Sequence, residues 1–292
     1  MAAPAAPRTA RRVTAHLLWT DPQGRAVLPP SPDDPDAPPH GGETLPGGRV
    51  RYGEDPAQVA RTAAGAPPGT PLTPRDVRTE LTLLHSAEGP LELHTDRLYY
   101  TAPLAACPAP PTGRRVPLRA AAALPALPAP ADLVEEEPAR PGRSLRRLAA
   151  YGVVTDPAGR LLLSLIAPGF PGENTWHLPG GGVDHGENPR AALRREIAEE
   201  TDQDAGVGAL ITITHHSSDR PPDPRTPTTQ TYAVWTFFHA HVADPGTPRV
   251  TEVEGSTADC AWFTTEELAD LPLSRTAQEG LAAIAAGAGL RG

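Results

Sequence analysis

The segment "LPGGGVDHGENPRAALRREIAEE", residues 178–200, joins a glycine-rich loop to a run of strong helix formers. Asn188 is a favourable N-cap, and Pro189 stands at the first helical position, where its missing N–H costs no hydrogen bond. The sequence therefore predicts a helix that begins at Pro189 and continues through the acidic end of the segment.

Three glutamates near the end of this helix fall on one of its sides. Glu196, Glu199 and Glu200 have the spacing i, i+3, i+4. Carboxylates this close repel one another and raise one another's pKa unless a cation neutralises them. Oxygen ligands on a rigid helix suit Mg²⁺, with Mn²⁺ as a second choice, and such ions recruit substrate phosphates. A divalent-metal site is therefore expected, and a solvated acidic helix is the alternative.

The stretch from residue 181 to residue 203 resembles the signature of the Nudix (MutT-like) hydrolase family. Seven of its nine fixed positions match at the correct spacing, namely Gly181, Glu187, Arg195, Glu196, Ile197, Glu199 and Glu200. The sequence departs at Asp202, where the family has a glycine that ends the helix, and at Gln203, where it has an aliphatic residue. Aspartate tolerates the left-handed conformation of such a glycine better than most residues, and neither departure removes a metal ligand.

The resemblance implies a role for each matching side chain. An ion pair between Glu187 and Arg195 would tie the glycine loop to the helix and orient the acidic cluster. The implied metal ligands are the carbonyl of Gly180 and the carboxylates of Glu196, Glu199 and Glu200. The glycines would let the backbone pass close to the metal.

The implied reaction is Mg²⁺-dependent hydrolysis of a diphosphate linkage in a nucleoside diphosphate derivative. Nucleoside triphosphates, nucleotide sugars, ADP-ribose and non-nucleoside diphosphates all remain open as substrates. The general base is open between Glu196 and an acid of a later loop, Glu252 or Glu254. Two alternatives are a catalytically quiet Nudix-fold module that binds or regulates, and isopentenyl-diphosphate isomerase chemistry. The isomerase would need an active-site cysteine, and neither cysteine lies in a matching motif.

Three further residues are candidates for contact with the substrate. Arg220 and Arg225 lie in a proline-rich loop and could bind phosphate, although solvated arginines are an equal alternative. Trp176 precedes the glycine loop and could stack on a base, although core packing is at least as good an interpretation.

An earlier segment, "LPGGRVRYGEDPAQVAR" at residues 45–61, nearly repeats the decisive one. At a shift of 133, residues 45–62 and 178–195 share nine identities in eighteen positions, and "TDPQGR" at residue 20 pairs with "TDPAGR" at residue 155. This pattern predicts a duplicated domain. The first copy has Thr62, Ala63, Ala66 and Pro67 in place of the arginine and the three helix glutamates. Pro67 and Pro68 should also end its helix early, so it is expected to be a degenerate copy.

The expected fold class is α/β (α+β), with two Nudix-type α/β/α sandwiches in tandem, each on a mixed β-sheet. Residues 1–130 would form the degenerate domain and residues 144–292 the catalytic domain. Residues 103–143 contain ten prolines and are expected to be an extended connector. In the second copy, strands are expected at 160–166 and 229–242 and before residue 264, with helices at 264–271 and 274–286.

The composition limits the partners. A net charge of −9 argues against stable binding to nucleic acid, and no apolar run reaches the length of a membrane span. Cys107 and Cys260 are the only cysteines, which favours two reduced thiols and a cytoplasmic location. A small-molecule diphosphate is therefore the expected partner, and a homodimer is left open.

Overall fold

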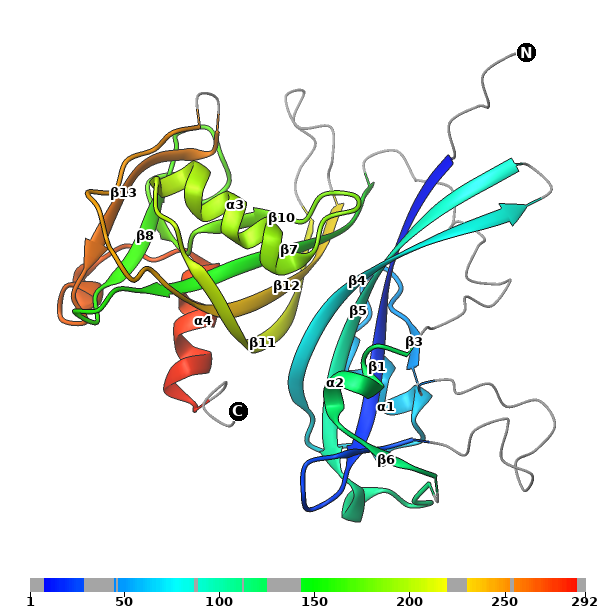
Figure 1. Cartoon of the computed structure of the whole chain (residues 1–292). Coiled ribbons are helices and arrows are strands. Elements are labelled where there is room, and N and C mark those ends of the chain that lie inside the picture. Colours follow the sequence, from blue (N-terminus) through cyan, green and yellow to red (C-terminus); the bar gives the residue numbers. More distant parts are fainter. Residues whose placement is uncertain are drawn as a thin grey trace. The chain divides into compact units, whose positions relative to one another are not determined.

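The computed structural model describes residues 8–28, 45, 47–86, 89–111, 113–124, 143–219, 230–252 and 255–287. The chain divides into two compact units, Met1–Arg146 with His215–Tyr232 and Arg147–Thr214 with Ala233–Gly292. Two mixed β-sheets accompanied by helices make this an α+β protein (Figure 1). Within the described residues, no helix is long and apolar enough to span a membrane.

The first sheet has the strand order β4-β5-β1-β2-β6, with β3 paired to β1. Its strands are β1 (Arg8–Thr20), β2 (Ala26–Val27), β3 (Gly47–Arg49), β4 (Thr73–Ser86), β5 (Gly89–Pro103) and β6 (Arg115–Val116). The accompanying helices are α1 (Pro56–Ala63), η1 (Leu104–Ala106) and α2 (Leu118–Ala121). β1 runs parallel to β5 and antiparallel to β2 and β3.

Helices cover both faces of the first sheet. A Cβ on Gly48 would lie 3.3 Å from a side-chain carbon of α1, while the Tyr99 hydroxyl donates to the carbonyl of Ala122, beside α2. Gly48 pairs with Ala15 and Tyr99 pairs with His16. Because successive strand residues point to opposite faces, α1 and α2 lie on opposite sides of the sheet.

The second sheet has the strand order β11-β12-β7-β8-β13, with β10 paired to β7 and β9 paired to β8. Its strands are β7 (Arg143–Thr155), β8 (Leu161–Ile166), β9 (Trp176–His177), β10 (Gly180–Gly182), β11 (Gly206–Asp219), β12 (Gln230–His241) and β13 (Thr257–Phe263). The helices are α3 (Pro189–Thr201), η3 (Glu267–Asp270) and α4 (Arg275–Ala285).

Helices also lie on both faces of the second sheet. A Cβ on Gly152 of β7 would lie 3.3 Å from Leu193 Cδ1 of α3, and one on Gly280 of α4 would lie 2.9 Å from Phe237 Cδ1 of β12. Phe237 shares a buried core cluster with Val153. Since Val153 follows Gly152 and points the other way, α3 and α4 pack on opposite faces.

The two sheets have the same strand order and the same register at the glycine strand. In the first, Gly47, Gly48 and Arg49 pair with His16, Ala15 and Thr14. In the second, Gly180, Gly181 and Gly182 pair with Tyr151, Ala150 and Ala149. Each residue of the second set lies 133 or 135 positions after its counterpart, which are the two shifts of the sequence repeat.

The turns that follow β1 and β7, which contain the repeated Thr-Asp-Pro sequence, also have the same hydrogen bonds. Asp21 Oδ1 accepts from the backbone N of Arg25 at 2.9 Å, and Asp21 Oδ2 accepts from Arg25 Nε at 2.8 Å. Asp156 makes the same bonds with the backbone N of Arg160 at 2.8 Å and with Arg160 Nε at 2.7 Å. The helices differ, because α1 ends at Ala63 whereas α3 continues to Thr201.

Two expectations about secondary structure need correction. The start of the proline-rich segment is not a connector, since β6 pairs with β2 and α2 places Ala121 and Ala122 in the core. Apolar burial outweighs local proline content there, while residues 125–142 lie outside the described part. The expected helix at 264–271 is only the 3-10 turn η3, because the cap between Thr264 and Glu267 is followed at once by Pro272.

Candidate functional site

The glycine loop needs glycine at two consecutive positions. Gly180 has φ +139, and a Cβ there would lie 2.2 Å from the carbonyl oxygen of Ala150. A Cβ on Gly181 would lie 2.6 Å from Oε1 of Glu196. The first glycine therefore lets β10 pair closely with β7, and the second lets the Glu196 carboxylate lie against the loop backbone.

Helix α3 begins and ends with side-chain support. Asn188 Oδ1 accepts from the backbone N of Arg190 at 2.9 Å, as expected of this N-cap. At the other end Asp202 adopts the left-handed conformation, with φ 54 and ψ 32, and its N–H donates to the carbonyl of Ala198. Arg249 Nε donates to Asp202 Oδ2 at 2.7 Å. Aspartate thus ends the helix where the signature has glycine.

The second departure from the signature is also accommodated. Gln203 is 4% exposed, and its amide accepts from the backbone N of Gly246 at 2.9 Å and donates to the carbonyl of Asp202 at 3.0 Å. A buried amide costs little when it is hydrogen-bonded. Gln203 therefore joins the end of α3 to the loop after β12 through hydrogen bonds instead of aliphatic packing.

Arg195 brings three carboxylates together. Its Nε and Nη2 donate to the two oxygens of Glu187, each at 3.0 Å, which is the strong bidentate arrangement. Its Nη1 donates to Glu196 Oε1 at 3.1 Å and to Glu199 Oε2 at 3.0 Å. Nη2 also reaches the carbonyl of Gly182 at 3.3 Å. One guanidinium therefore links the glycine loop to the acidic face of α3.

Glu200 is the most buried acid of the helix, at 5% exposed. Its Oε2 accepts from the backbone N of Gly180 and from Ser164 Oγ, both at 3.1 Å, and its Oε1 accepts from Thr257 Oγ1 at 3.0 Å. Burial nevertheless raises the pKa of Glu200 to about 8. Without a cation, this carboxyl is therefore mostly protonated at neutral pH.

Burial also raises the pKa of Glu196 above its ordinary value, and the charges of Glu199 and Glu252 raise it further. Arg195 acts in the opposite direction on the same group. Glu199 is the exposed member of the set, with 42% of its side chain accessible. On α3, Glu200 is therefore buried, Glu196 is half-buried, and Glu199 is the most accessible of the three.

The donor set fits a hard divalent cation. Glu196 and Glu200 both lie beside the two glycines. The Glu196 carboxylate lies where a Cβ on Gly181 would be, and Glu200 accepts a hydrogen bond from the backbone N of Gly180. Their raised pKa values show that a nearby positive charge would be favourable. Within the described residues, however, no three His, Cys, Asp or Glu side chains are already arranged as a metal cluster.

The remaining expected site residues fall into two groups. Trp176 packs edge-on against Phe263, with ring centroids 4.6 Å apart, and belongs to the partly buried rim of the core. Arg220, Arg225 and Glu254 lie outside the described residues. Glu252 is described, and its backbone N donates to the carbonyl of Glu199 at 3.1 Å, so this candidate base lies at the end of α3.

The partners of Glu200 were not predicted from the sequence. Ser164 comes from β8 and Thr257 from β13, and no local motif marks either as a partner of Glu200. His177, two residues before Pro179, was also missed. Burial lowers the pKa of His177 to about 4, so its ring is neutral, and Nδ1 lies 2.8 Å from Ser274 Oγ. Ser274 caps α4, so this pair ties β9 to that helix.

Comparisons with known proteins find a NUDIX domain in the C-terminal half of the chain. Residues 145–284 match the model of the NUDIX domain, and no family match supports a second such copy in the first unit. No curated protein matches the chain.

Several solved structures are similar to the chain. A MutT NUDIX hydrolase from Burkholderia pseudomallei is 27% identical, with 48% of this chain and 99% of that one covered and a TM-score of 0.37. The NUDIX domain of Shewanella oneidensis NrtR, solved with ADP ribose, is 17% identical, with 48% and 87% covered and a TM-score of 0.37. The M. smegmatis Nudix hydrolase RenU is 24% identical, with 49% and 89% covered and a TM-score of 0.35.

Proposed function

We propose that the NUDIX domain is a Mg²⁺-dependent hydrolase that cleaves a diphosphate linkage in a nucleoside diphosphate derivative. The observation that carries this proposal is the arrangement around Arg195, which holds Glu187, Glu196 and Glu199 while Glu200 lies on the glycine loop. An ordinary solvated acidic helix would not bury one of its glutamates or align the others on a single guanidinium.

Glu196, Glu199 and Glu200, with the carbonyl of Gly180, would hold the metal, for which Mn²⁺ is a substitute. When bound, the metal would polarise phosphate oxygens and make a coordinated water more acidic. The protein's own part is orientation and proton transfer. Glu196 has a raised pKa, which suits a general base, and Glu252 or Glu254 is the alternative.

The groups around Glu200 have a positioning role in this proposal. Ser164 and Thr257 donate to its two oxygens from neighbouring strands, so they fix its rotamer before any ligand arrives. Partners of this kind are worth about 10- to 100-fold in metal affinity or activity in other metalloproteins. Substrate contacts by Arg220, Arg225 and Trp176 remain proposals, and the packing of Trp176 on Phe263 makes it the weakest of the three.

The first unit fits a degenerate copy of the same domain. Its sheet has the same strand order, and its glycine strand has the same register. Glu54 also repeats the contact of Glu187, since it accepts from the backbone N of Arg51 at 2.7 Å as Glu187 does from Asp184 at 3.2 Å. Thr62 stands where the second unit has Arg195, and Glu54 Oε1 instead lies 3.9 Å from Arg51 Nη1. We therefore assign catalysis to the second unit alone.

The test is turnover of a panel of nucleoside triphosphates, nucleotide sugars, ADP-ribose and non-nucleoside diphosphates with Mg²⁺. We expect at least one compound to be hydrolysed, and Glu200→Gln to lower the rate by about 100-fold or more. Glu266→Gln makes the same chemical change on an exposed glutamate outside the site and should leave the rate unchanged. Hydrolysis that survives Glu200→Gln would refute the assignment of the site. Binding of a compound without hydrolysis of any would favour the quiet binding module instead.

A further inference from the structure

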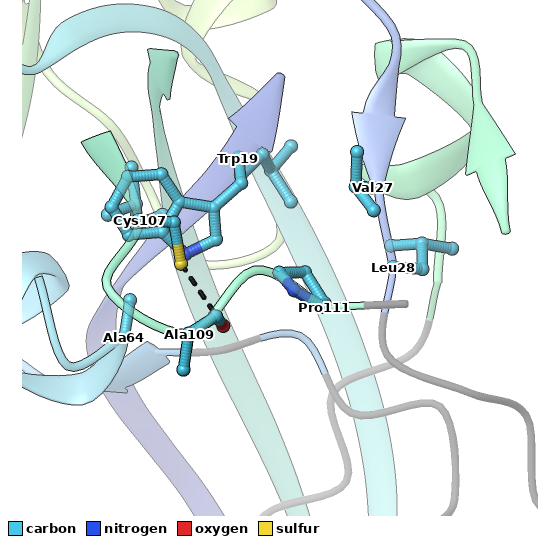
Figure 2. Close-up of a pocket in the computed structure, with 9 residues that line it drawn as sticks. Trp19, Val27, Leu28, Ala64, Cys107, Ala109 and Pro111 are labelled. Carbon is cyan, nitrogen blue, oxygen red and sulfur yellow. Dashed lines mark hydrogen bonds between the residues drawn. The ribbon is translucent and has the colours of Figure 1, made fainter. Parts of the chain in front are cut away.

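The first unit contains a pocket of about 150 Å³ that the proposed hydrolysis does not use (Figure 2). Its floor is buried and includes Leu17, Trp19 and Leu28, with exposed fractions of 0%, 3% and 1%. Its rim includes Ala64 and Cys107, which are both partly exposed. The pocket therefore has a water-excluded floor and an accessible rim.

The pocket lies where the first unit lacks the end of a helix. Ala64 follows the last residue of α1 and, at the shift of 133, corresponds to Ile197, from which α3 continues to Thr201. Leu17, at the shift of 135, corresponds to Gly152, where an added Cβ would lie 3.5 Å from Ile197 Cδ1. Part of the pocket lining therefore lies on the face of the sheet that the end of α3 covers in the second unit.

The segment after β5 closes the pocket from the side. Cys107 and Pro111 lie between β5 and β6, just as the loop that caps α3 lies between β12 and β13. Helix α1 is shorter than α3. The segment with Cys107 and Pro111 therefore lines the pocket together with Trp19 and Ala64, and not with a further helical turn (Figure 2). The pocket lies between this segment, Trp19 and Ala64.

The described side chains that line the pocket are mostly apolar. None of these nine described residues is charged or carries a hydroxyl group. The polar side-chain contact drawn in Figure 2 is the bond from Cys107 Sγ to the carbonyl of Ala109, at 3.3 Å. A phosphate or a metal ion would lose its hydration here without finding a partner. An engineered, enclosed apolar cavity of about this volume binds benzene.

We propose that the first unit binds a small, uncharged, apolar molecule in this pocket, of the size of a single aromatic ring or an indole. The inference is independent of the proposed hydrolysis, because it uses no residue of the second unit. The ligand would lie beside the end of α1, next to Leu17, whose counterpart Gly152 lies against Ile197 of α3 in the second unit.

The thiol of Cys107 provides a direct readout in the full chain. Iodoacetamide labelling of Cys107, followed by peptide mass spectrometry, is measured with benzene or indole and without ligand. At a ligand concentration of ten times Kd, occupancy should slow labelling by about tenfold. Cys260 is buried and burial raises its pKa to about 11, so it should label little with or without ligand and the signal should report Cys107. Benzoate is the charged control and should give no protection.

A pocket-filling variant and a second method complete the test. Ala64→Leu adds apolar volume at the rim and should abolish protection by benzene. Saturation-transfer NMR on the wild type, which needs no variant, should show benzene and indole signals but none from benzoate. Absence of both protection and saturation transfer with benzene and indole would overturn the proposal. Equal binding of benzoate, or protection that persists in Ala64→Leu, would also overturn it, since the ligand would then lie elsewhere.

Discussion

Metal binding should release a proton from Glu200. Burial raises the pKa of this carboxyl to about 8, whereas a metal ligand must be ionised. A group with that pKa is about 0.9 protonated at pH 7 and about 0.1 protonated at pH 9. Each Mg²⁺ bound should therefore displace about 0.9 proton from Glu200 at pH 7 and about 0.1 at pH 9. Glu196, whose pKa is also raised, can only add to these values.

Isothermal titration calorimetry measures this release. Mg²⁺ or Mn²⁺ is titrated into the metal-free protein in two buffers that differ in ionisation enthalpy, and the difference in heat gives the protons released. Glu199→Gln is the matched variant, because it removes an exposed carboxylate and leaves the buried one; its release at pH 7 should remain close to that of the wild type. Glu200→Gln should lose about 0.9 proton or lose binding altogether.

An infrared measurement tests the protonation of Glu200 independently of metal binding. The metal-free wild type at pH 6 should show the C=O band of a protonated carboxylic acid, and the variant should lack it. Release of less than about half a proton at pH 7 would refute the reasoning, because Glu200 would then be ionised before the metal arrives. Equal release at pH 7 and pH 9 would refute it as well.

Three further outcomes follow from the geometry. Glu187→Gln should lower Mg²⁺-dependent turnover by about tenfold or more, whereas Glu54→Gln, the same change in the first unit, should leave turnover unchanged; equal effects would contradict the assignment of catalysis to one unit. Gly181→Ala places a Cβ 2.6 Å from Glu196 Oε1. This variant should lower kcat/KM by about tenfold with a small change in Tm. Wild-type kinetics would show that the loop is free to shift. Asp202→Ala should cost about 1 kcal/mol of unfolding free energy in urea, because alanine is less tolerant of the left-handed conformation, whereas Asp202→Gly should be close to neutral.

Features set by neighbouring residues could be predicted from the sequence. The start of α3 depends on Asn188 and Pro189, whereas the pairing of Glu187 with Arg195 was expected from the resemblance to the Nudix signature. The repeat of the glycine segment likewise indicated the shared register of the two sheets, because identical backbone requirements recur at identical spacing. Local sequence is sufficient to predict features that depend on adjacent residues.

Features set by distant residues could not be predicted in this way. The bonds to Glu200 come from positions 36 and 57 residues away, and the ion pair that supports Asp202 spans 47 residues. Serine, threonine and arginine are common on surfaces, so nothing in their local sequence marks these contacts. β6 and α2 were missed for a related reason, since burial of Ala121 and Ala122 decides their structure against the proline content.

Under the proposal that the first unit is a degenerate copy, the fold persists where the metal site is lost. Pairing of a glycine strand with the central strand uses backbone groups, so it tolerates almost any change in the side chains that follow. The metal site instead needs an uninterrupted helix that carries acids at three specific positions on one side. The helix of the first unit ends at Ala63, and Gly65 follows in the left-handed conformation with φ 61, two residues before Pro67. Acids at positions 66 and 67 would therefore not lie on a helix, so both Gly65 and the prolines would have to change before the carboxylates could be recovered.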